Sequence, residues 1–75
     1  MQYSDVMIYI HNPLDALARS GIEGRLRGMA GVAGVQFDPT RQRMLMLAFD
    51  PSRTSPALLL QAVSSAGYTA GLIGL

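Results

Sequence analysis

The residues best suited to chemistry lie together in one short stretch, from His11 to Asp15. His11 is the single histidine of the chain, and the amide of Asn12 and the carboxylate of Asp15 follow it closely. An imidazole and a carboxylate suit a borderline metal ion, so His11 and Asp15 form a candidate site for Zn, Ni or Cu. Because two protein ligands rarely hold a metal ion without a third, we favour the alternative of an exposed histidine and a helix-capping aspartate.

The composition excludes several classes of function. With no cysteine, the chain has neither a disulfide framework nor a thiolate metal site. A net charge of +1 gives no reason to expect nucleic acid as a partner. No apolar run is long enough to span a membrane, and no catalytic triad order or phosphate-binding glycine loop is visible. We therefore expect a single domain over residues 1–75 that is not an enzyme and is cytoplasmic.

Local patterns place the His11–Asp15 stretch between a strand and a helix. Residues 5–11 alternate in polarity, with apolar β-branched side chains on one face, as in a β-strand. Asn12-Pro13 breaks that strand, and Asn12 or Asp15 caps the helix that follows. The apolar residues expected along the buried side of this helix are Leu14, Leu17, Ala18, Ile22, Leu26 and Met29. Gly31 is expected to end the helix.

The second half of the chain predicts three more strands and one more helix. Residues 32–37 and 44–49 are short apolar strands joined by a polar hairpin loop. Ser55 caps a second helix with Pro56 at its first position, Gly67 stops it, and residues 68–75 form a fourth strand. This order predicts an α+β, ferredoxin-like βαββαβ sandwich: a four-stranded antiparallel sheet with two helices on one face. The first and third strands are expected to be central neighbours.

One face of the predicted sheet carries unusual side chains. If the β-branched residues face the helices, then Met7, Tyr9, Met44 and Met46 share the opposite face. That face of a helix-backed sheet normally meets water and is polar. Thioethers also suit Cu(I), but we favour an interface, because an exposed apolar patch marks a protein–protein surface and methionine adapts to partners.

With its elements laid out, the chain resembles the heavy-metal-associated (HMA) domain of copper chaperones, mercury-binding proteins and metal-pump N-termini. The resemblance covers residues 6–73 and rests on core and turn positions. These are Ile22, Glu23, Leu26, Gly31, Val32, Val35, Leu45, Leu47, Phe49, Asp50, Leu59, Val63, Gly67 and Tyr68. The resemblance implies the same fold and a role in heavy-metal transport. The apolar face of Met7, Tyr9, Met44 and Met46 predicts a protein partner or a homodimer, and the partner could belong to a larger metal-transport protein.

The metal motif of that family, Gly-Met-x-Cys-x-x-Cys, falls on the loop before the first helix. The loop at the former metal site comprises Asn12, Pro13, Leu14, Asp15 and Ala18, and Tyr68 matches an aromatic position that packs under it. Asp15 and Ala18 stand where the two cysteines would be. A carboxylate and a methyl group cannot replace two thiolates for Cu(I). The resemblance is therefore to a degenerate member without the usual metal site.

The sequence thus favours a non-catalytic HMA-like binding module that acts through protein–protein contact or self-association. Atypical metal binding at His11 and Asp15 is the first alternative. A second arises from Asn12-Pro13 and the Leu17-Ala18-Arg19 segment, which resemble the loop-to-helix segment of ACT domains. That resemblance implies binding of a small amino acid at the helix start.

Overall fold

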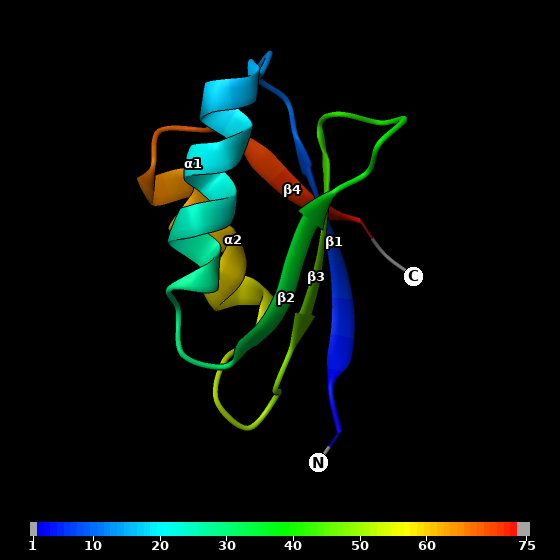
Figure 1. Cartoon of the computed structure of the whole chain (residues 1–75). Coiled ribbons are helices and arrows are strands. Elements are labelled where there is room, and N and C mark those ends of the chain that lie inside the picture. The colour runs from blue at the N-terminus through cyan, green and yellow to red at the C-terminus, as the bar shows by residue number, and fades with distance from the viewer. Residues whose placement is uncertain (1, 74–75) are drawn as a thin grey trace.

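Six secondary-structure elements follow one another in the predicted order (Figure 1). The computed structural model describes residues 2–73. The elements are β1 (Ser4–Ile10), α1 (Ala16–Arg27), β2 (Val32–Phe37), β3 (Met44–Phe49), α2 (Pro56–Ser65) and β4 (Ala70–Ile73). The strands form one antiparallel sheet in the order β2-β3-β1-β4, and Figure 1 shows both helices on the same side of it. The prediction of a ferredoxin-like α+β sandwich is confirmed.

The register of the central strands divides the sheet into a core face and an open face. Val6 pairs with Leu47 and Ile8 with Leu45, which directs these side chains toward the helices. The buried core consists of Val6, Ile8, Ile10, Ile22, Leu26, Val35, Leu45, Leu47, Phe49, Leu59 and Val63. Since side chains alternate along a strand, the residues between these positions lie on the face that no helix covers.

Helix α1 ends earlier than the sequence predicts. The helix ends at Arg27 with Gly28 as its C-cap, because the last turn tightens: Met29 N–H donates to the Leu26 carbonyl at 3.1 Å. Gly31 instead forms the turn into β2 with a φ of 91°, and its carbonyl accepts from Asp50 N–H at 2.7 Å. The prediction that Gly31 ends the helix is therefore wrong.

Leu17 is also misplaced by the helical pattern. The sequence puts it on the buried side of α1, but its side chain is 83% exposed. Leu17 lies nine residues before Leu26, which is about two and a half turns at 3.6 residues per turn. The two side chains therefore point to opposite sides of α1, and Ile22 and Leu26 are the helix's buried residues.

The strand ends differ from prediction by a few residues. β1 stops at Ile10, so His11 follows the strand instead of ending it. β4 covers Ala70–Ile73 of the predicted 68–75, and Gly74 and Leu75 lie outside the described residues.

Candidate functional site

The loop after β1 is held in place by backbone and side-chain hydrogen bonds. His11 N–H donates to the Thr69 carbonyl at 2.8 Å, and Asn12 Oδ1 accepts from Thr69 N–H at 2.7 Å. The exposed His11 ring stacks on Tyr9, with ring centroids 5.2 Å apart. The loop is thus tied to the segment before β4, and His11 leans toward the open face of the sheet.

Asp15 is the N-cap of α1. Its carboxylate accepts a hydrogen bond from Ala18 N–H at 2.7 Å, which satisfies one of the helix's free N–H groups. Within residues 2–73 the structure gathers no group of three His, Cys, Asp or Glu side chains that would hold a metal ion. The sequence left the capping residue open between Asn12 and Asp15, and the structure assigns it to Asp15. Metal binding by His11 and Asp15 remains a prediction.

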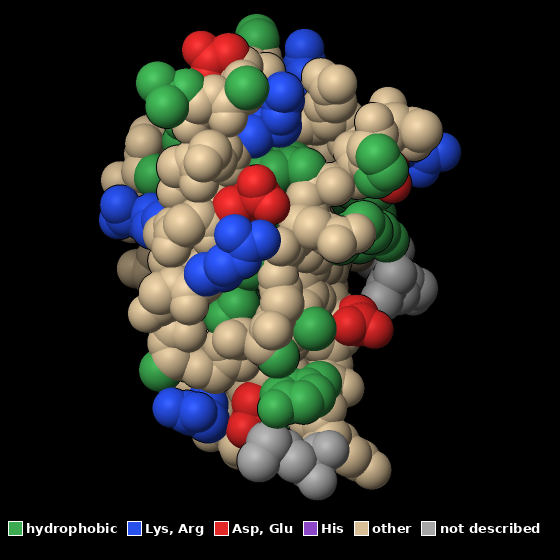
Figure 2. Space-filling model, viewed as in Figure 1, with side chains coloured by type: hydrophobic (Ala, Val, Ile, Leu, Met, Phe, Trp, Pro, Cys, Tyr) green, Lys and Arg blue, Asp and Glu red, His purple; other side chains and the backbone are tan. Residues whose placement is uncertain are grey.

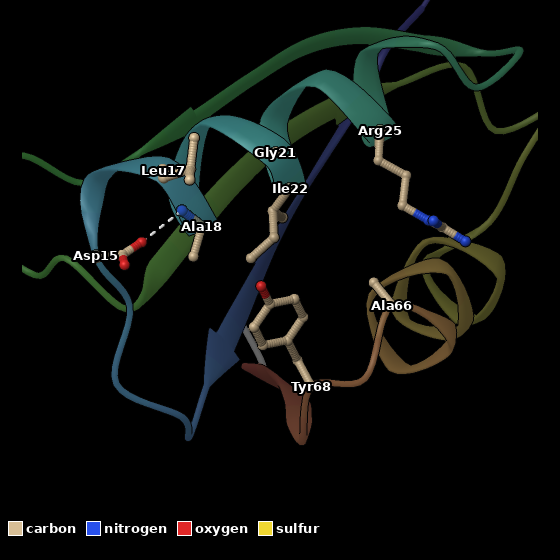
Figure 3. Close-up of a pocket in the computed structure, with 8 residues that line it drawn as sticks. All are labelled: Asp15, Leu17, Ala18, Gly21, Ile22, Arg25, Ala66 and Tyr68. Atoms are coloured by element: carbon tan, nitrogen blue, oxygen red, sulfur yellow. Dashed lines mark hydrogen bonds between the residues drawn. The ribbon is translucent and has the colours of Figure 1, made fainter.

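A shallow hollow lies where the resemblance places the former metal site (Figure 3). It is lined by Asp15, Leu17, Ala18, Gly21, Ile22, Arg25, Ala66 and Tyr68. Figure 3 shows the Tyr68 ring between α1 and the end of α2, with its hydroxyl directed toward α1. Of the other loop residues, Leu14 packs against the core and Pro13 is exposed. The hollow therefore combines the loop's helix start with Tyr68, without a thiol.

The four predicted interface residues come together on the open face. Met7 is the direct register partner of Met46, and Tyr9 is the partner of Met44. All four side chains are half-buried. On the other side of β1, Ile73 of β4 pairs with Met7 and extends the apolar surface. We call the surface formed by these five residues the methionine face.

Beside the methionine face is a second hollow that sequence reasoning missed. It lies over β1, β2 and β3, and its lining side chains on this face are Asp5, Met7, Gly34, Gln36, Met46 and Ala48. The small residues Gly34 and Ala48 pair across β2 and β3 and leave the space open. Gly34 within a strand pattern is a signal for a close approach or a bulge, and the ladder is indeed irregular between Val32 and Gly34. The glycine alone does not predict which strand pairs with β2 at this point.

The charge that lines this second hollow is negative. Among residues 2–73, Asp5 is the only charged side chain that lines it. On the face seen in Figure 2, the basic side chains are scattered and not gathered into one patch. Arg27, for example, pairs with Glu23 at 3.5 Å and donates to the Val35 carbonyl at 3.0 Å, which covers part of the β2 edge.

Two further carboxylates have a structural role. Asp38 and Asp50 each close a turn at one end of β3. Hydrogen bonds from the Thr40 hydroxyl and from the Thr40 and Arg41 N–H groups hold the pKa of Asp38 below its ordinary value. The hydroxyl and N–H of Ser52 likewise hold the pKa of Asp50 below its ordinary value.

Within residues 2–73, no helix is long and apolar enough to span a membrane.

Comparison with solved structures places the fold. Oxidized MerP from Ralstonia metallidurans CH34 superposes with a TM-score of 0.86 at 19% identity, covering 97% of this chain and 100% of that one. The N-terminal domain of a potential copper-translocating P-type ATPase from Bacillus subtilis, in its Cu(I)-loaded state, gives 0.86 at 25% identity, covering 97% and 90%. The chain has the heavy-metal-associated fold. The yeast copper transporter domain CCC2A matches this HMA fold too, with a TM-score of 0.82 at 13% identity over 93% and 94%.

The likeness of this chain to HMA domains is a likeness of fold. No known family profile and no curated protein matches the sequence. The absence of cysteine makes the chain a degenerate HMA-like domain without the Cys-x-x-Cys motif.

Proposed function

We propose that the chain is a non-catalytic binding module of a heavy-metal handling system, which docks through its methionine face. The occupant of that face is a protein partner or a second copy of the chain. Similar domains belong to a potential copper-translocating P-type ATPase and a yeast copper transporter, so the setting of this proposal is a metal transport system.

The observation that carries the proposal is the polarity of the methionine face. In a sheet with helices on one side, the other side normally meets water and is polar. Here the central strands present Met7 and Tyr9 opposite Met46 and Met44, and Ile73 adjoins them from β4. Flexible thioethers and an aromatic ring pack well against varied partner surfaces, and a contiguous apolar patch marks such a contact.

The test replaces the centre of this face with a charge. Met46→Glu places a carboxylate where a docked partner would exclude water, so association should weaken by about tenfold or more, since 1.4 kcal/mol is a factor of ten. Sedimentation over a range of protein concentrations measures the mass. Pulldown with a purified full-length transporter of the heavy-metal handling system measures docking to a protein partner.

Leu58→Glu is the matched control. Leu58 is 49% exposed on α2, which packs on the covered side of the sheet, so a charge there should leave association unchanged. Equal behaviour of Met46→Glu and the unaltered chain in both assays would contradict the proposal.

The two alternatives from the sequence are separable with the same protein. Metal binding at the loop requires that Zn(II), Ni(II) or Cu(II) change the nuclear magnetic resonance chemical shifts of His11 and Asp15. These changes should disappear in His11→Ala. Binding of a small amino acid requires a rise in melting temperature with ligand concentration, since a ligand of the folded state stabilises it. Either result, together with unchanged sedimentation of Met46→Glu, would replace docking as the function.

A further inference from the structure

Most of the methionine thioethers, which are soft metal ligands, lie on one side of the sheet. The sequence has five methionines and no cysteine, so its thioethers are its only sulfur ligands. Three of them, Met7, Met44 and Met46, lie on the open face of adjacent strands. Met29 packs against the core instead.

The ladder puts the three thioethers within reach of one ion. Met7 and Met46 are direct partners, and Cα atoms of such antiparallel pairs lie about 4.5–5.5 Å apart. Met44 is two residues from Met46 on the same face, about 6.5–7 Å along the strand, and diagonal to Met7. Each side chain has three rotatable bonds, so its sulfur can swing toward a shared point above the sheet.

The charges differ between the two ends of the methionine face. Among the described residues, the carboxylate of Asp5 lines the hollow beside Met7 and Met46, whereas Arg41 and Arg43 line the hollow beside Met44. Tyr9 is the register partner of Met44, and Ile73 is the register partner of Met7, so apolar side chains adjoin two of the methionines. A neutral sulfur set with one nearby negative charge fits a soft monovalent ion, whereas Zn(II), Mg(II) and Ca(II) prefer nitrogen, oxygen or thiolate ligands.

We propose that Met7, Met44 and Met46 form a thioether site for Cu(I), with Asp5 supplying the counter-charge. The site lies on the open sheet face, away from the loop where the HMA motif would place two cysteines. This inference goes beyond the proposed docking function: it shares the methionine face but does not require a partner. It assigns the metal-binding role to the sheet and leaves His11 and Asp15 outside the site.

The test uses Ag(I), a soft ion with the same charge as Cu(I), and the intact chain labelled at its methionine methyl groups. Nuclear magnetic resonance should show the methyl signals of Met7, Met44 and Met46 shifting together and saturating near one equivalent. The methyl signal of Met29 should stay in place. Zn(II) should produce no such shifts.

Leucine variants separate ligation from packing. Met→Leu is close to volume-conserving, so the leucine variants should stay folded. Loss of a mere supporting contact already lowers metal affinity by about 10–100-fold, so Met7→Leu or Met46→Leu should weaken Ag(I) binding by at least about tenfold. Asp5→Asn should weaken it by a smaller factor, and Met29→Leu and His11→Ala should leave it unchanged.

Three results would overturn the site: Ag(I) shifts that include Met29 equally, binding retained in the Met7/Met44/Met46 triple leucine variant, or loss of binding in His11→Ala. The docking proposal fails by a different route. Leucine keeps the apolar area, so the leucine variants should still associate in sedimentation, whereas Met46→Glu should not.

Discussion

Asp15 shows the capping role that the sequence analysis favoured for it over metal binding. It stands where the HMA motif has a cysteine, yet its carboxylate accepts a hydrogen bond from Ala18 N–H at 2.7 Å and begins α1. A carboxylate at this end also interacts favourably with the helix dipole. The resemblance places Asp15 at a ligand position of the motif, while its contacts are those of a helix cap.

Removing that cap should destabilise the protein measurably. Asp15→Ala leaves the Ala18 N–H without its partner, and we expect the free energy of unfolding to fall by about 1 kcal/mol in urea titrations. Asp15→Asn retains an oxygen acceptor and should recover most of the loss. Equal losses in the two variants would show that capping is not the origin of the effect.

At the scale of the element, the glycines of the first half have opposite roles. Gly21 and Gly24 sit inside α1, where a Cβ would meet nothing within 4 Å, so they weaken the helix without a steric reason. Gly31 is different, because its φ of 91° and the neighbouring Arg53 and Thr54 leave no room for a side chain. The same residue type thus reduces stability in one element and makes the connection to the next.

Two alanine variants form a matched pair that tests this contrast. Gly24→Ala should raise the free energy of unfolding by up to about 1 kcal/mol, the difference in helix propensity between the two residues. Gly31→Ala should lower it by more than that, because the new Cβ would lie 2.9 Å from the Arg53 Cβ in a backbone region that alanine avoids. Urea unfolding measures both, and a stabilising Gly31→Ala would contradict the structural argument.

At the scale of the whole molecule, global stability depends on turns at both ends of the central strand β3. The carboxylates of Asp38 and Asp50 accept these hydrogen bonds more strongly when ionised, and both therefore have a lowered pKa in the folded chain. A lowered folded pKa means that the unfolded chain binds protons more readily as the solution becomes acidic.

Acid should therefore destabilise the protein in a defined window. The contribution of the two aspartates is present above their ordinary pKa of 3.8 and is lost as the pH falls through their lower folded values. The free energy of unfolding should decrease as the pH falls below about 5. The Asp38→Asn, Asp50→Asn double variant should show a shallower decrease in urea titrations, and an unchanged slope would rule out these turns as its source.

The sequence by itself determined the element order, the fold and most of the core. Alternation over residues 5–11, the Ser55-Pro56 start of α2 and the paired strands 32–37 and 44–49 are local patterns, and local patterns are set by side chains a few residues apart. The same periodicity placed Met7, Tyr9, Met44 and Met46 on one face. It failed at Leu17 and Gly31, where the outcome depends on which side of α1 meets the sheet and where its last turn tightens.

Only the tertiary structure decided which distant residues touch. The pairing of Met7 with Met46, the addition of Ile73 from β4 and the hollow over Gly34 and Ala48 depend on strand register, and a shift of one residue would reverse every side chain. Register is fixed by the summed packing of the core and by the irregular ladder near Gly34, which no local window contains. The loop could be predicted from the sequence because its residues are contiguous in the chain. The methionine face could be predicted only in part, because it is assembled from three strands.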